Sequence, residues 1–351
     1  MSPSSAAPVV AGPGRPLLRA AERALGGRRS VRAARRVVRD VWRLWLDSGD
    51  RVVAKRHPAA DGLAVPAADP LVVEAEVLAR LAVAGAAVPQ FLGADAAERV
   101  AVFSDVGTWT LDDWLQARPG ADPHLWAARA VDAVGGVEQA LAGATASLQR
   151  WVPAWAQKSA LTRAWAAAIR QAQTGLAWLV PPPGREAAAC LAELADDLAR
   201  RSPTLGSADY NPGNVVVDPV AGTVCLIEFS ALGWDWPERR LVQYTTSLGA
   251  RRPDGQLTPL LNVAAVDQAA TLGFDAVAID GHWLVFLLNL AAVLAQVERA
   301  AATGPTRLWA GTERRRQLQA ALSVPLAASG PAAACRRCIH QISFVEGEET
   351  R

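Results

Sequence analysis

The chain has few cysteines and no long hydrophobic run, and its charge is nearly balanced. Four cysteines, at positions 190, 225, 335 and 338, are too scattered among 351 residues for a disulfide framework. A net charge of +2 gives no reason to expect nucleic acid or a membrane as a partner. The longest apolar run, Trp283 to Gln296, falls short of a membrane span and predicts a buried helix. With no secretory signal, we expect a cytoplasmic globular protein.

Lysine is also scarce. Of the 36 basic residues only two, Lys55 and Lys158, are lysines. Because the chain uses arginine wherever any cation suffices, a lysine indicates a position where a compact point charge is preferred. Ten arginines lie within the first 43 residues, against two acids. We expect residues 1–28 to form a basic flexible tail and a first helix near Arg15 to Ala24, rather than a transit-type peptide.

Three segments that follow this region alternate apolar with polar residues. They are residues 30–38, 40–49 and 50–57. A period of two is expected of antiparallel strands. The next segment changes to a helical period, with Asp69 able to cap its start and Gly85 able to end it. Residues 88–107 return to strands, which predicts a small sheet with one helix.

From Leu111 onward nearly every segment has a helical pattern, apart from one hairpin. This order predicts an α+β protein in which a small sheet-rich lobe is joined to a larger helical lobe. We expect the N-lobe at 29–105, the C-lobe at 106–334 and a C-terminal tail at 335–351. Ligands usually bind in the cleft between such lobes.

The hairpin carries the most unusual polar residues. Two apolar runs, "NVVVD" and "VCLIEF", are joined by a short turn. A turn centred on Ala221 would place Asn214 opposite Glu228, whereas a turn shorter by one residue would place it opposite Ile227. An amide oxygen and a carboxylate are ligands that Mg²⁺ accepts. Asp209, five residues before Asn214, could then accept a proton from an attacking hydroxyl.

Lys55 is the second candidate for a functional residue. It shares a strand face with Val53, so both side chains project toward the same surface. Glu74, on the helix that follows, is positioned to pair with it, while Leu78 and Leu81 hold that helix against the sheet. A compact cation of this kind suits the binding of phosphate.

These residues together resemble the aminoglycoside phosphotransferase and choline kinase superfamily, whose fold is similar to that of the protein kinases. The resemblance lies in Asp209, then "YNPG", then Asn214, and in the later "IEF" where the family has "IDF". It also covers "VVAK" and "EAEVLARLA". It implies a two-lobed protein-kinase-like fold with a small antiparallel-sheet N-lobe, a large helical C-lobe and a catalytic hairpin.

The resemblance also implies a role for each residue. Lys55 would bind the α- and β-phosphates of ATP or GTP, and Glu74 would hold that lysine. Asp209 would be the catalytic residue. The nucleotide base would lie under Val53, against backbone groups of Ser104, Asp105 and Val106, and the Mg²⁺ ligands would be Asn214 and Glu228.

The chain departs from the family pattern at three positions around this site. Ser207 replaces a histidine, Glu228 replaces an aspartate, and Arg240 stands where an aspartate braces the catalytic loop. The sequence therefore predicts ATP- or GTP-dependent, Mg²⁺-assisted phosphoryl transfer to a hydroxyl. The alternative is a catalytically silent member that binds a nucleotide or a partner protein.

Two further features concern the acceptor and a possible metal. Six tryptophans of the C-lobe are expected in its helical core; if several line the cleft instead, the acceptor is apolar or peptide-like rather than a polycationic sugar. They are Trp114, Trp126, Trp151, Trp155, Trp165 and Trp178. In the tail, Cys335, Cys338 and His340 supply only three ligands, so ordinary cysteines are favoured over a zinc site.

Overall fold

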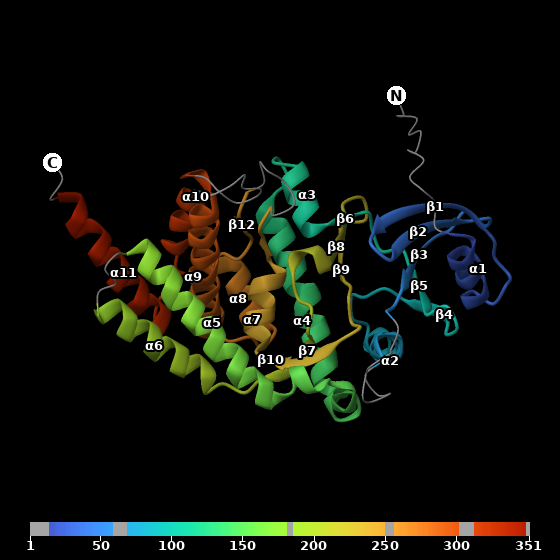
Figure 1. Ribbon diagram of the computed structural model, residues 1–351, viewed down its shortest axis with the longest axis horizontal. Coiled ribbons are helices and arrows are strands. Elements are labelled where there is room, and N and C mark those ends of the chain that lie inside the picture. Colours follow the sequence, from blue (N-terminus) through green and yellow to red (C-terminus); the bar gives the residue numbers. More distant parts are fainter. Residues whose placement is uncertain (1–13, 59–68, 181–184, 250–255, 302–311, 349–351) are drawn as a thin grey trace.

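The computed structural model describes residues 14–58, 69–180, 185–249, 256–301 and 312–348. Figure 1 shows two parts, a strand-rich lobe formed by the first third of the chain and a larger lobe of helices. Most of the predicted basic tail, residues 1–13, lies outside the described residues. The predicted α+β, two-lobed architecture is confirmed.

The N-lobe is a five-stranded antiparallel sheet in the order β1-β2-β3-β5-β4. Its strands lie where the sequence pattern predicts them, and on β2 and β3 buried residues alternate with more exposed ones. Their bounds are β1 (Val31–Val38), β2 (Val41–Leu46), β3 (Arg51–Arg56), β4 (Phe91–Asp95) and β5 (Val100–Ser104).

Two helices cover opposite faces of this sheet. On β5, Val100 and Val102 pack in a core with α1 (Arg15–Ala24), whereas Ala101 and Phe103 belong to the core that contains α2 (Pro70–Val83). α1 lies where it was predicted, but its buried face makes it part of the N-lobe rather than part of a tail. The face of the sheet that α2 covers is therefore the face turned toward the helical lobe (Figure 1).

The start and end of α2 follow from its terminal residues. The Asp69 side chain accepts a hydrogen bond from the backbone of Leu71 at 2.9 Å, and Pro70 occupies the first turn, where no amide donor is needed. Beyond the end of the helix, Gly85 adopts a φ of 72°, which favours glycine. The helix buries Glu74 together with its apolar residues, so a carboxylate points into the protein.

The C-lobe is built around α9 (Ala276–Ala301), which contacts most of the other long helices. This helix is longer than the predicted segment and has the length and hydropathy to cross a membrane, but 78% of its apolar window is buried inside the protein. The other helices are α3 (Leu111–Ala117), α4 (Pro123–Leu148), α5 (Lys158–Leu179), α6 (Arg185–Ala199), α7 (Pro237–Tyr244), α8 (Val263–Thr271), α10 (Thr312–Leu322) and α11 (Pro331–Glu348).

Short strands form small sheets in the C-lobe. One small sheet has the order β6-β8-β9, another pairs β10 with β7, and a third pairs β11 with β12. Their bounds are β6 (Trp109–Thr110), β7 (Thr204–Ser207), β8 (Val215–Asp218), β9 (Thr223–Leu226), β10 (Leu232–Asp235), β11 (Thr246–Ser247) and β12 (Thr258–Pro259). The loop between β7 and β8 contains the predicted catalytic residue.

The predicted C-terminal tail is wrong over most of its length. Its residues belong to α11, which packs on α6, and Cys335 and Cys338 are both buried there. Cys190 of α6 lies with its sulfur 3.1 Å from that of Cys338. Among the described residues no group of three or more His, Cys, Asp or Glu side chains could hold a metal, and the side chain of His340 lies outside them.

The tryptophans divide between core and surface. Trp126 and Trp165 are buried, and Trp114, Trp151 and Trp178 pack partly buried against the same core, as predicted. Trp155 differs, because 64% of its surface is exposed. An exposed indole of this size needs another explanation than core packing.

Candidate active site

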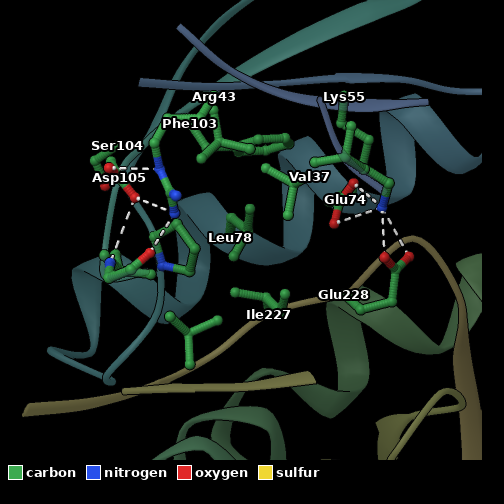
Figure 2. A pocket seen from close by; sticks show the side chains of 16 residues that line it. Val37, Arg43, Lys55, Glu74, Leu78, Phe103, Ser104, Asp105, Ile227 and Glu228 are labelled. Atoms are coloured by element: carbon green, nitrogen blue, oxygen red, sulfur yellow. Dashed lines mark hydrogen bonds and ion pairs between the residues drawn. The ribbon is translucent and has the colours of Figure 1, made fainter. Parts of the chain in front are cut away.

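A cavity lies between the two lobes, where the α2 face of the sheet meets the β8–β9 hairpin (Figure 2). It encloses about 700 Å³, including the open mouth. Ionic side chains lie at its two ends: Lys55, Glu74 and Glu228 at one end, and Arg43 and Asp105 at the other. The walls between them are apolar, which is the usual composition of a ligand site.

Lys55 is held by two carboxylates. Its Nζ lies 2.9 Å from Oε2 of Glu74, and 2.7 Å and 2.9 Å from the two carboxylate oxygens of Glu228. Glu74 also lies 3.1 Å from Nε2 of His57, a buried histidine that the sequence gave no reason to include. The structure thus brings together three predicted residues that are up to 173 positions apart.

The charges in this cluster are mutually dependent. Burial alone would raise the pKa of Glu74, but Lys55 and His57 outweigh burial and lower that pKa below its usual value. Burial alone would lower the pKa of Lys55, but Glu74 and Glu228 raise that pKa above the usual value for lysine. Both groups are therefore charged at neutral pH.

Glu228 has an unusual backbone conformation. Its φ is 72°, in the left-handed region that non-glycine residues seldom adopt. Two hydrogen bonds hold this conformation: the Ser207 hydroxyl donates to the Glu228 carbonyl at 2.9 Å, and the backbone of Phe229 donates to Glu74 at 3.2 Å. Strain maintained by specific bonds is typical of functional positions.

The opposite end of the cavity is fixed by Arg43 on β2. Its guanidinium donates to both carboxylate oxygens of Asp105, at 2.9 Å and 3.2 Å, and to the carbonyl of Gly107. Ser104, Asp105 and Val106 line the cavity here, as does Val53. The backbone N–H of Ser104 already donates to the Gln90 carbonyl at 2.9 Å. Because Arg43 binds both of its carboxylate oxygens, the Asp105 side chain holds the segment between the lobes in place and does not point at a ligand.

Several wall residues were missed from sequence. They come from both lobes and are apolar, so single-residue chemistry gives no signal for them. Alternation does give a signal for Phe103, because it lies two residues before Asp105 and therefore on the same side of the chain. The missed apolar residues are Val37, Val41, Leu78, Pro89, Phe103, Val216 and Ile227.

The loop between β7 and β8 presents Asp209 to solvent. Asn211 donates to its carboxylate at 2.8 Å, and the Asn214 side chain donates to its carbonyl at 2.8 Å. The Asp209 backbone N–H donates to the Ser207 hydroxyl at 3.2 Å, and the same hydroxyl donates to Glu228. Ser207 thus links this loop to the cavity.

The hairpin register is the shorter of the two that were considered. Val215 pairs with Leu226 and Asp218 pairs with Thr223, and the Ile227 N–H donates to the Asn214 carbonyl at 2.9 Å. The pairing of Asn214 with Glu228 across the strands is therefore wrong. Asp218 is the cause, because its side chain accepts from two amides of the turn and closes it at four residues.

Arg240 occupies a fully buried position on α7. Its guanidinium binds both carboxylate oxygens of Glu138 on α4, and it also donates to Thr204 and to the Asp235 carbonyl at 3.1 Å. Burial alone would lower the pKa of Arg240, but Glu138 outweighs burial and raises it. A Cβ at Gly206 would lie 2.4 Å from this guanidinium, so the strand before the loop packs directly on it.

The neighbouring Asp235 contacts the loop that contains Asp209. Its carboxylate accepts from the hydroxyl of Tyr210, from Arg239 at 2.9 Å and from the backbone of Trp236 at 2.8 Å. Burial raises the pKa of Tyr210, so its hydroxyl remains a donor at neutral pH. The loop is thus braced from both ends, by Ser207 and by Tyr210.

The protein is similar to proteins of known structure. The crystal structure of an aminoglycoside phosphotransferase from Alicyclobacillus acidocaldarius is similar over 91% of this chain and 93% of its own, with 13% identity and a TM-score of 0.52. A choline/ethanolamine kinase family protein from Mesorhizobium loti is similar over 88% and 92%, with 15% identity and a TM-score of 0.46. No curated protein matches the sequence.

The first of these similarities shows that the fold is shared. The sequence itself matches the model of the phosphotransferase enzyme family over residues 31–278, which is more than two thirds of the chain. The chain therefore belongs to the phosphotransferase enzyme family and is by family a phosphotransferase of hydroxyl acceptors.

Proposed function

We propose that this protein transfers the γ-phosphoryl group of ATP or GTP to a hydroxyl of a small molecule or a peptide-like acceptor. The observation that carries the proposal is the cluster of Lys55, Glu74 and Glu228 at one end of an apolar cavity between the lobes. All four cysteines are free thiols, which suits a reducing compartment such as the cytoplasm.

The two ends of the cavity suit different parts of a nucleotide. The apolar walls around Val53 and Phe103 suit a purine base, whose edge would meet the backbone of Ser104 to Val106. The phosphates would lie at the other end, where Lys55 supplies a compact positive charge. Glu74 keeps that lysine charged and extended toward the phosphates.

Glu228 and Asn214 would be the residues that hold a magnesium ion near this end. Glu228 offers a carboxylate, and Asn214 uses its amide nitrogen in a hydrogen bond, which leaves its oxygen to bind a cation. Among the described residues no group of three or more His, Cys, Asp or Glu could hold a metal. Magnesium suits such a sparse set, since phosphates and water complete its shell. When bound, the ion neutralises charge on the terminal phosphates.

Asp209 would receive the proton of the acceptor. In this step the acceptor oxygen bonds to the γ-phosphorus, and the bond from that phosphorus to the bridging oxygen breaks with its electron pair leaving on the nucleotide diphosphate. The hydroxyl proton passes to the Asp209 carboxylate, which is exposed and accepts a hydrogen bond from Asn211, while Asn214 donates to the Asp209 carbonyl. Such catalysis is mainly positioning and charge neutralisation.

A catalytically silent, nucleotide-binding protein is the second candidate, and one observation favours it. Both oxygens of Glu228 lie within 2.9 Å of Lys55, so the proposed metal ligand and the proposed phosphate ligand bind each other. A nucleotide would have to displace this ion pair before the two residues could act on phosphates.

The test uses the Asp209→Asn variant. We expect transfer of γ-phosphate, and the accompanying nucleotide hydrolysis, to fall at least about 10³-fold because general base and acceptor positioning are lost together. Nucleotide affinity measured by calorimetry should stay within about threefold. Asp196→Asn makes the same chemical change at an exposed position of α6 and serves as the control. Unchanged transfer in Asp209→Asn would exclude the proposed function.

The silent alternative has its own decisive measurement. If the wild-type protein binds nucleotide but neither hydrolyses nor transfers γ-phosphate, the second candidate is correct. Measurable turnover that disappears in Glu228→Ala excludes it, because a silent protein has no turnover to lose.

A further inference from the structure

A second cavity lies beside the catalytic loop on the C-lobe. It encloses about 550 Å³, including its open mouth. Three parts of the chain line it: the 3₁₀ helix Ala154–Ala156 with the start of α5, the loop residues Ser207, Ala208 and Tyr210, and the end of β10 with Arg239 of α7. The cavity thus includes the residues on both sides of Asp209.

One hydrogen bond joins a residue that lines the second cavity to a residue that lines the first. Ser207 lines the second cavity, Glu228 lines the first, and the Ser207 hydroxyl donates to the Glu228 carbonyl at 2.9 Å. Asp209 follows Ser207 by two residues and is exposed. A molecule in the second cavity would therefore contact the two residues that flank Asp209.

The walls of this second cavity are aromatic and flat. Trp155, Trp234 and Tyr210 line it, and apart from Leu161 the remaining apolar residues are alanine or glycine. The exposure of Trp155, 64%, is explained if its ring forms a wall for a ligand. At Gly233 a Cβ would lie 3.1 Å from the Cβ of Ala156, so this wall has little room for a larger side chain.

The charges around the cavity do not suit a polycation. Asp235 is the carboxylate among its lining residues, and it is already bound by Tyr210, Arg239 and the Trp236 backbone. It has no strong hydrogen-bonding capacity left for an ammonium group. A ligand with several amines would find Asp209 as its nearest partner, and Asp209 is needed for the reaction.

A cation beside one wall of the cavity points to the opposite charge. Lys158 places its Nζ 3.9 Å from the centre of the Trp234 ring, and no acid within the described ranges forms an ion pair with it. It is one of only two lysines in the chain, and the other belongs to the proposed phosphate site. Lys158 is also exposed, so its charge is available to a ligand.

We propose that the second cavity binds the acceptor, and that the acceptor is an aromatic alcohol carrying an acidic group. Its ring packs on Trp155 and Trp234, its carboxylate or similar anion pairs with Lys158, and its hydroxyl reaches Asp209. This inference rests on the proposed phosphotransferase function, but the binding preference that it predicts can be measured without turnover.

The test compares two probes that differ only in charge. One is a hydroxymethyl-naphthoate, and the other is the naphthalenemethanol with an aminomethyl group in place of the carboxylate. At neutral pH and low salt we expect the anionic probe to bind about tenfold more tightly, as one ion pair near water contributes. Tryptophan fluorescence follows binding, since Trp155 and Trp234 form the walls.

Two charge reversals then locate the effect. Lys158→Glu should remove the preference for the anionic probe or reverse it. Arg150→Glu makes the same reversal at an arginine that also lies over a tryptophan, 4.9 Å from the Trp151 ring, but Trp151, unlike Trp234, does not line the cavity. It should leave the preference within about twofold of the wild type.

The outcomes separate this inference from the proposed function. Tighter binding of the cationic probe or of kanamycin, no effect of Lys158→Glu, or no binding of either probe at millimolar concentration overturns the inference. So does transfer of phosphate to kanamycin in preference to the naphthoate. If the naphthoate binds through Lys158 but no acceptor is phosphorylated and no nucleotide is hydrolysed, the proposed function fails while the ligand preference of the cavity stands.

Discussion

Two of the ion pairs that bury a carboxylate against a cation in this molecule use different cations. On α7, the side chain of Arg240 has no exposed surface and holds Glu138 through two parallel contacts. In the cavity, Lys55 keeps 16% of its side chain exposed and holds Glu74, while Glu228 on its other side is 24% exposed. The first pair is closed, and the second opens onto a cavity.

The difference shows how this chain distributes its cations. A planar guanidinium satisfies several fixed acceptors at once, so arginine suits a pair whose partners never change. A lysine ammonium is a point charge that can exchange one oxygen partner for another, so it suits a site where phosphate replaces a carboxylate. Lys55 lines the first cavity, and Lys158 lies over the ring of Trp234, which lines the second.

Exchanging the cation in the cavity should have the largest effect. In Lys55→Arg the wider guanidinium would occupy the space of the phosphates and remain bound to Glu74 and Glu228. We expect phosphoryl transfer to fall at least about 10³-fold, equivalent to about 4 kcal/mol of transition-state stabilisation. The free energy of unfolding should change by about 1 kcal/mol or less, because charge is retained. Transfer within about tenfold of wild type would contradict this distinction between the two cations.

The reciprocal exchange should have the opposite profile. Arg240→Lys cannot bind both oxygens of Glu138 and also reach Thr204 and Asp235, so buried acceptors lose their donors. We expect the free energy of unfolding in urea to fall by about 3 kcal/mol. The transfer rate of the folded protein should remain within about threefold. A large loss of rate without a loss of stability would show that Arg240 is not mainly structural.

A substitution at Gly206 tests the packing against the buried pair of Arg240 and Glu138. Gly206→Ala would push a methyl group against the Arg240 guanidinium, and we expect it to lower the free energy of unfolding by about 2 kcal/mol. Gly143→Ala, in an exposed turn of α4 with nothing within 4 Å, should instead raise it by about 1 kcal/mol. In the double variant with Arg240→Lys, the cost of Gly206→Ala should shrink, because the flexible lysine can move away. Additive costs would contradict the contact.

Much of the N-lobe could be predicted because its signals are local. Alternation placed β1, β2 and β3, and the Asp69 cap with Gly85 placed α2. The misassignments concern tertiary packing. α1 was predicted as a helix, but whether it and α11 are covered depends on which surfaces they meet, and no local pattern specifies those surfaces.

The site could be predicted where single residues carry the chemistry. Lys55, Glu74 and Glu228 were identified and do come together. The register of the hairpin was not fixed by its apolar runs, because it depends on Asp218 closing the turn. The Arg43 contact with Asp105 joins residues 62 positions apart, and no local pattern links them.

The stability contributed by the pair of Lys55 and Glu74 should also depend on pH, and this effect should be smaller than those of the three substitutions above. The pKa of Glu74 is below its usual value in the folded protein, so the folded state holds fewer protons on this group than the unfolded chain does. The resulting stability is present above the unfolded pKa of about 4.3 and is lost as pH falls through the folded pKa. Glu74→Gln lacks this contribution. The stability difference between wild type and variant should therefore narrow below about pH 4.3, by at most about 1.4 kcal/mol per pH unit. Urea unfolding from neutral pH to about pH 3 measures it, and a constant difference over that range would mean that Lys55 and His57 do not outweigh the burial of Glu74.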